Sequence, residues 1–206
     1  MEIKLSTVRH KRGRLGRTLS VFICALISVG EVAHSCGYHN SVDLARGMLN
    51  WVYPNSLYVR TAVWKAEDAG ILPKRASVPG KDPFAYQRVA LAMRNYADLM
   101  SKANFAAGEM QGLSVLLIES VLWARFIRTT EGYSVEIHAE GAAPNDVVMV
   151  TDDKVMFSLV AGTITPRVAR EHGLIRLYGP SDSIENVADR LDRVPVAKQA
   201  SAGNVP

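Results

Sequence analysis

The sequence predicts an α+β fold in which one mostly antiparallel sheet is covered by helices on one face. Residues 113–151 hold short apolar runs separated by turns, and residues 133–138 alternate apolar and polar side chains as a half-buried strand does. Helical patterns precede this block, and shorter ones follow it. Strands and helices that are segregated along the chain are typical of a single sheet with a helical layer.

The helices expected before the sheet have recognisable boundaries. Ser41 can cap a helix that ends near Val52, and Asn55 or Ser56 can cap a second helix that ends at Ala69. The next segment, residues 73–82, contains two prolines and a glycine and is expected to be a linker. The Asp82-Pro83 pair then predicts the start of a longer helix that runs to about Ala103.

After the strands, two acidic residues and a Thr-Pro pair mark two short helices. Asp152-Asp153 opens one that reaches Val160, and Thr165-Pro166 opens another that Gly173 ends. The predicted strands are 113–118, 121–128, 133–138, 146–151 and 174–178, and a final helix is expected over 180–191.

The first 35 residues are expected to be an export signal. A basic segment that ends at Arg17 is followed by the twelve-residue apolar run 19–30, which is shorter than the ~20 residues that span a bilayer. Ala33 and Ser35 then place small residues three and one before Cys36, as cleavage requires. An uncleaved anchor is the alternative. We therefore expect a bacterial protein that works in the periplasm.

The basic overall charge belongs to this leader. Residues 1–35 hold six of the 24 basic and two of the 20 acidic residues, so 18 of each sign remain from residue 36 onward. A nucleic-acid-binding surface would need a basic surplus in the folded part. The sequence therefore predicts no nucleic-acid partner.

Cys36 is the single cysteine that a cleaved chain would keep, so no internal disulfide is expected. Ala33-His34-Ser35-Cys36 is similar to a degenerate lipoprotein box, in which this cysteine is lipidated and anchors the protein to the membrane. A plain, unmodified N-terminus is equally compatible with the sequence.

Residues 146–179 resemble the sterol carrier protein-2-like (SCP2-like) family. The features that carry the resemblance are helix starts, helix-ending glycines and a small residue at a helix–sheet contact: Thr151-Asp152-Asp153, Leu159, Gly162, Thr165-Pro166, Ala169 and Gly173, followed by the strand 174–179. The order of elements extends the resemblance over 83–192. It implies a cavity between sheet and helices that accepts an acyl chain or a sterol-like ligand, with no catalytic residues and no cofactor. The export signal and the helical pair before residue 82 are not typical of the family.

The expected organisation is thus a signal peptide over 1–35, a helical extension and linker over 36–82, an SCP2-like domain over 83–192, and a disordered tail over 193–206. The candidate ligand-binding residues are apolar and lie on the expected strands and their covering helices: Trp123, Phe126, Val135, Ile137, Val148, Val150, Met156, Phe157, Leu174 and Leu177. All of them are equally suited to an ordinary core, so lipid carriage depends on unfilled volume beneath the strands after residue 112.

Two charged residues interrupt the apolar stretch 113–126. Glu119 and Arg125 could stand at the mouth of such a cavity, where Arg125 would bind a carboxylate or phosphate. A bulge at Glu119 and an arginine at the rim of a strand are the structural alternative, which we favour.

No enzymatic or metal motif is evident. Ser114 and Ser120 lack the G-x-S-x-G context, and His39, His138 and His172 are scattered, so we expect no enzyme and no metal site. The main functional hypothesis is a non-enzymatic binding protein for a hydrophobic small molecule. The alternative is a module with a filled interior that docks onto a periplasmic protein through the aromatic residues Trp51, Tyr53, Tyr58 and Trp64.

Overall fold

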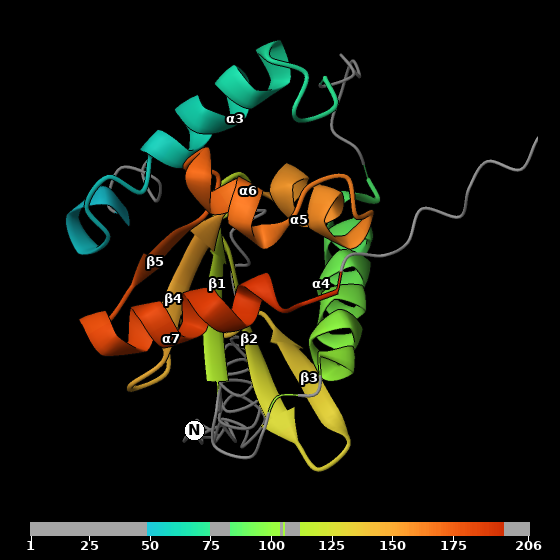
Figure 1. The fold of residues 1–206 in the computed structure, drawn as a ribbon, viewed down its shortest axis with the longest axis vertical. Helices are drawn as coiled ribbons and strands as arrows, with labels where there is room; N and C mark the ends of the chain where they lie inside the picture. The colour runs from blue at the N-terminus through green and yellow to red at the C-terminus, as the bar shows by residue number, and fades with distance from the viewer. Residues whose placement is uncertain (1–48, 75–82, 104, 106–111, 196–206) are drawn as a thin grey trace, which may run out of the picture. The chain divides into compact units, whose positions relative to one another are not determined.

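The structure, a computed structural model, describes residues 49–74, 83–103, 105 and 112–195 (Figure 1). The chain divides into two compact units, Met1–His34 and Ser35–Pro206, and every described residue belongs to the second. The predicted export signal, Cys36, His39, most of the linker and the end of the tail lie outside the described residues.

One five-stranded sheet forms the centre of the second unit. Its strands are β1 (Gly112–Leu117), β2 (Leu122–Thr129), β3 (Gly132–Ile137), β4 (Val147–Thr151) and β5 (Arg176–Tyr178). They are arranged in the order β3-β2-β1-β4-β5 (Figure 1). Neighbours pair antiparallel except for β1 and β4, which are parallel. The predicted α+β class and mostly antiparallel sheet are confirmed.

Five α-helices of the described residues carry element labels: α3 (Tyr58–Asp68), α4 (Ala85–Lys102), α5 (Asp153–Val160), α6 (Pro166–Glu171) and α7 (Ser181–Asp192). Two predicted helix starts are confirmed in atomic detail. The side chain of Asp152 accepts a hydrogen bond from the Lys154 backbone at 3.0 Å, and the hydroxyl of Thr165 accepts one from the Val168 backbone at 3.2 Å. These bonds satisfy amides that have no partner within the helix.

Other local predictions were wrong. Neither Asn55 nor Ser56 caps α3, which has Leu57 at its N-cap without any side-chain bond. Asn55 instead adopts the left-handed conformation with φ 68°, a conformation that asparagine tolerates better than most residues. Thr151 does not cap α5, because its hydroxyl donates to the Leu174 carbonyl at 2.9 Å.

The last strand is shorter than expected. The backbone amides of Leu174 and Ile175 both donate to the carbonyl of Ala169 in α6, at 2.8 Å and 3.3 Å. These two residues therefore close the end of α6 and are not available to the sheet. Gly173 makes this tight closure possible with φ 68°.

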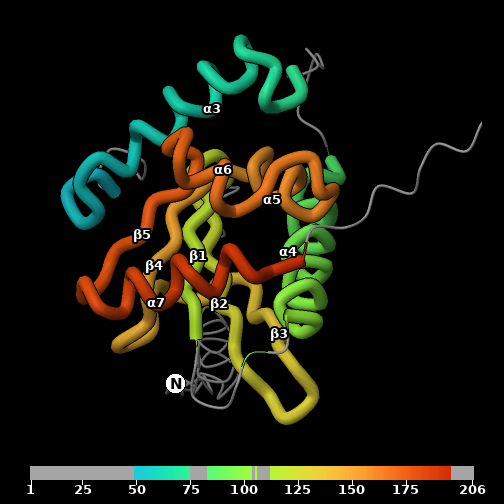
Figure 2. The backbone as a smooth tube through the Cα atoms, in the orientation of Figure 1, coloured from blue at the N-terminus to red at the C-terminus, as the bar shows by residue number. Residues whose placement is uncertain are grey.

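The main helices cover one face of the sheet. α4 packs against β3 and α5, while α7 contacts β4 and β5, and Figure 2 shows α7 crossing the front of the sheet with α4 beside β3. We call the buried layer between this face and the helices the helix-facing interior. Large side chains from both sides meet there, including Met93 and Met100 of α4, Phe126 of β2 and Met149 of β4.

The opposite, or back, face of the sheet is partly covered by the helical extension. Val59 packs with Leu116 and Val150 there. The ring of Tyr53 lies 5.9 Å from that of Trp123 and 5.2 Å from that of Tyr178. The described part of the extension is therefore folded onto the domain along residues 49–72.

Candidate functional site

The ten predicted ligand-binding residues do not meet at one place. Phe126, Val135, Ile137, Met156, Leu174 and Leu177 belong to the helix-facing interior. Trp123, Val148 and Val150 lie on the back face, because successive residues of a strand point to opposite faces of a sheet. Phe157 is exposed on the outer side of α5.

The interior group encloses no free space around its central members. Phe126 and Leu174 expose none of their surface and Met156 exposes 1%. A side chain that lines a cavity wide enough for an acyl chain would leave part of its surface without protein contact. The unfilled volume that simple lipid carriage requires is therefore missing around these three residues.

One polar atom interrupts this apolar packing. Tyr96 of α4 is 1% exposed, and its ring packs edge-to-face on Phe126 with centroids 5.8 Å apart. Its hydroxyl has no hydrogen-bond partner among the described residues. Tyr96 lies on the buried side of α4, and nothing in the sequence indicates that its hydroxyl lacks a partner.

Four methionines share this interior with Tyr96. Met93 and Met100 lie on α4, Met149 on β4 and Met156 on α5, and all four are fully buried or nearly so. Methionine side chains are unbranched and flexible, and they repack more readily than other apolar side chains. The interior that contains Tyr96 therefore holds four side chains that can repack.

An ion-paired carboxylate influences Tyr96 from the end of α7. Burial raises the pKa of Tyr96 well above its usual value, and the charge of Asp192 raises it further. Oδ2 of Asp192 accepts hydrogen bonds from Arg167 at 3.2 Å and from Arg170 at 2.5 Å. Oδ1 of Asp192 is buried and has no hydrogen-bond partner among the described residues. Tyr96 therefore remains a protonated hydrogen-bond donor at any physiological pH.

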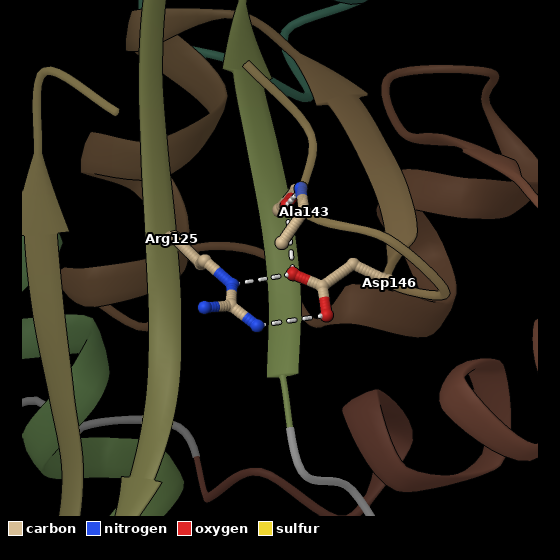
Figure 3. Close-up of polar contacts among 4 residues, drawn as sticks. Arg125, Ala143 and Asp146 are labelled. Carbon is tan, nitrogen blue, oxygen red and sulfur yellow. Dashed lines mark hydrogen bonds and ion pairs between the residues drawn. The ribbon is translucent and has the colours of Figure 1, made fainter. Parts of the chain in front are cut away.

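Arg125 does not stand free at a cavity mouth. Its Nε and Nη2 bind the two carboxylate oxygens of Asp146 at 2.8 Å and 3.3 Å (Figure 3). Ser114 donates to the same carboxylate at 2.8 Å and accepts from the Ala143 backbone at 3.3 Å. This pair fixes the loop before β4 onto β1 and β2.

Glu119 is likewise engaged, in an ion pair with Arg60 of α3 at 3.2 Å. It lies in the turn between β1 and β2, where Ser120 donates a hydrogen bond to Asp153 at 2.9 Å. Burial raises the pKa of Asp153 to about 7, and the charge of Asp152 adds to this rise while the bond from Ser120 opposes it. The turn therefore joins the sheet to α3 and α5 through buried or half-buried charges.

A surface groove of about 710 Å³ lies where the end of α4 meets the β2–β3 hairpin. Asp98, Ser101 and Lys102 line one side, and Thr129 and Ser134 belong to the other. The groove is open, and most of the residues that line it are polar or charged, so it does not enclose an apolar ligand as a lipid site would. No predicted ligand-binding residue lines it.

The predicted partner surface is only partly exposed. Trp51, Tyr58 and Trp64 are exposed, whereas Tyr53 is half-buried against the back face. Among the described residues, no group of three His, Cys, Asp or Glu side chains is arranged to hold a metal ion. In the same part of the chain, no helix is long and apolar enough to cross a membrane.

No protein-family model matches the sequence, and no curated protein matches it significantly. Solved structures do match. Sterol carrier protein 2 like 2 from Aedes aegypti is 19% identical over 50% of this chain and 96% of its own, with a TM-score of 0.37. The ubiquinone synthesis protein UbiJ-SCP2 is 13% identical over 54% and 94%, with a TM-score of 0.34.

A third match is the sec-alkylsulfatase Pisa1 from Pseudomonas sp., which is 12% identical with a TM-score of 0.38. It involves 48% of this chain and spans only 16% of that enzyme. Several sterol carrier protein-2 domains are thus among the solved structures that this chain resembles.

Proposed function

We propose that the domain binds a hydrophobic small molecule, either a neutral lipid or a sterol-like compound, and catalyses no reaction on it. The observation that carries this proposal is the buried hydroxyl of Tyr96, which has no partner among the described residues. Burying such a group without a hydrogen bond costs about 1–3 kcal/mol. A ligand oxygen placed beside Tyr96 would remove this cost.

Binding of this kind requires the ligand to displace side chains that now fill the interior. Met93, Met100, Met149 and Met156 surround the same buried layer, and their flexible thioethers can move aside with little strain. Apolar burial of the ligand then supplies the driving force, at about 0.8 kcal/mol per methylene group. The ligand therefore opens the site as it binds, and no preformed cavity is required.

The charge near Tyr96 selects among lipids. Asp192 already raises the pKa of the tyrosine through its negative charge, and a ligand carboxylate at the same place would be repelled in the same way. A hydroxyl, ester or ketone oxygen carries no such charge and can accept the hydrogen bond from Tyr96. The proposed ligand is therefore a neutral compound with one polar end.

The proposal includes an extracytoplasmic location, which the sequence alone supports. The basic segment that ends at Arg17, the apolar run 19–30 and the small residues before Cys36 have the order of an export signal. Lipidation of Cys36 would hold the domain at the membrane that contains its ligand.

The test compares two fluorescent probes on the full chain and its Tyr96→Phe variant. Dehydroergosterol carries one hydroxyl, and diphenylhexatriene has no hydrogen-bonding atom. We expect saturable binding of both probes, with the affinity for the sterol about fivefold weaker in the variant and that for the hydrocarbon unchanged. Tyr178→Phe, which removes a hydroxyl that donates to Pro54 on the back face, is the matched control and should leave both affinities unchanged. An equal loss of affinity for both probes in Tyr96→Phe, or no saturable binding of either probe, would refute the proposal.

The tight packing favours a second candidate, a module with a filled interior that binds a periplasmic protein. Phe126 and Leu174 leave no free surface, as an ordinary core requires. Native mass spectrometry of protein purified from its host separates the two functions. A co-purified lipid supports the first candidate, and a lipid-free chain that retains a bound protein supports the second.

A further inference from the structure

Exposed apolar side chains are concentrated on one short segment of the domain. Seven large hydrophobic residues of the described chain are exposed, and four of them fall within residues 51–64. These four are Trp51, Val52, Tyr58 and Trp64, which we call the aromatic ridge. Trp51 is 89% exposed and Trp64 is 56% exposed, so these rings do not contribute to the core.

Buried residues that lie between the members of the ridge in the sequence keep the ridge on the outer side. Val59 and Val63 bury the opposite side of α3, and Tyr53 is fixed between Trp123 and Tyr178. At about 100° per residue, Tyr58 and Trp64 stand at the two edges of an exposed arc of about 120° on α3. Neither ring can turn inward without losing these contacts.

Ion pairs fix the same helix to the domain at two places. Arg60 pairs with Glu119 of the β1–β2 turn, and Glu67 pairs with Lys154 of α5. The guanidinium carbon of Arg176 also lies 6.0 Å from the centroid of the Tyr58 ring. The ridge is therefore presented on a supported element rather than on a loose one.

Charge does not direct the ridge toward an oppositely charged partner. Residues 49–72 contain two basic residues, Arg60 and Lys65, and two acidic residues, Glu67 and Asp68. Tryptophan and tyrosine, by contrast, are the residues that concentrate at the boundary between water and lipid, where the ring is buried and its polar atom stays hydrated. A neutral surface with two tryptophans and one tyrosine fits that boundary.

The position of the ridge in the chain limits its distance from the predicted export signal and from Cys36. Trp51 follows the end of the apolar run 19–30 by 21 residues and follows Cys36 by 15. An extended chain spans at most about 3.5 Å per residue, so the run can be no farther than about 70 Å from Trp51. Either a retained apolar run or a lipidated Cys36 would keep the ridge at a high local concentration beside lipid.

We propose that the aromatic ridge docks onto the interfacial region of a phospholipid bilayer. The side chains of Trp51 and Trp64 lie among the lipid carbonyl groups, and α3 rests parallel to the bilayer surface. This inference goes beyond the proposed function and shares with it only the expectation that the chain works at a membrane. The helix-facing interior and Tyr96 take no part in the docking.

The three tryptophans of the chain provide the test. In the full chain with Trp123→Phe, the tryptophan emission comes from Trp51 and Trp64 alone. With vesicles of phosphatidylcholine that is brominated near the carbonyl end of its acyl chains, we expect at least half of this emission to be quenched, compared with unbrominated vesicles. The matched reporter carries Trp51→Phe and Trp64→Phe, and its remaining Trp123, which lies beneath Tyr53, should not be quenched.

Binding strength provides a second readout. Trp51→Ser and Trp64→Ser should each lower the vesicle partition coefficient about tenfold, and added salt should leave it unchanged because the ridge is neutral. Leu91→Ser, which removes an exposed apolar side chain from α4, should have no effect. Unquenched emission from Trp51 and Trp64 on vesicle-bound protein would overturn the proposal. The proposal would also fail if an added periplasmic protein, but not vesicles, shielded these two rings from a water-soluble quencher. Since Tyr96-dependent uptake uses other residues, these variants should retain it whether or not the ridge docks.

Discussion

Asp153 allows the electrostatics of the β1–β2 turn to be tested quantitatively. Its pKa is raised from 3.8 in the unfolded chain to about 7 in the folded domain, first by burial and then by the charge of Asp152. A carboxyl with a raised pKa contributes stability that is fully present below pH 3.8 and is lost as the pH rises through about 7. Stability should therefore fall with rising pH over this range, the reverse of the usual behaviour of a paired carboxylate.

The magnitude follows from the size of the shift. Each pKa unit corresponds to 1.36 kcal/mol, so ionising Asp153 in place costs at most about 4 kcal/mol. In Asp153→Asn the amide oxygen can still accept the bond from Ser120, but it never ionises. The free energy of unfolding of the variant minus that of the wild type should increase by about 2 kcal/mol between pH 5 and pH 7.

Urea unfolding of both proteins across this pH range measures the difference directly. Ser120→Ala removes the hydrogen bond that opposes the pKa rise, so it should move the midpoint of the pH dependence upward. A difference between wild type and Asp153→Asn that stays constant from pH 5 to pH 7 would refute the reasoning, because it would mean that Asp153 is ionised throughout.

Two further pairs of variants test the contacts that hold the fold. Asp146→Ala removes the carboxylate partner of Arg125, whose side chain is partly exposed, and it should lower the free energy of unfolding by about 2 kcal/mol in thermal or urea unfolding. Gly112→Ala should be similarly disruptive, since its Cβ would lie 2.6 Å from the same carboxylate. Thr165→Ala removes the cap of α6 and should lower the free energy of unfolding by about 1 kcal/mol. Thr165→Ser keeps a hydroxyl and should retain most of this stability. An equal loss of stability in both variants would show that the hydroxyl does not act as a cap.

The sequence predicted the strands and the later helices well because their signals are local. The alternation over residues 133–138 reports one buried face, and the hydroxyl of Thr165 acts only three residues along the chain. The start of α3 was missed for the opposite reason. Ser56 is fully buried in the folded domain, so tertiary packing overrides its preference for a cap.

The candidate site was less predictable because it depends on contacts between distant residues. Apolar residues on neighbouring strand positions look equivalent in a sequence, although Trp123 and Phe126 lie on opposite faces of β2. The sequence does not reveal that Arg125 pairs with Asp146, which lies 21 residues away along the chain. The unpartnered hydroxyl of Tyr96 is a property of the whole interior and has no local signal.

Methionine-methyl NMR of the isotopically labelled full chain tests the central claim most directly. As dehydroergosterol is added, the signals of Met93, Met100, Met149 and Met156 should move to new positions together, because all four line the layer that the ligand must open. Tyr96→Phe should require several times more sterol for the same change. If these four signals stay in place at saturating sterol while the protein remains folded, the interior is a closed core and the domain does not bind lipid there.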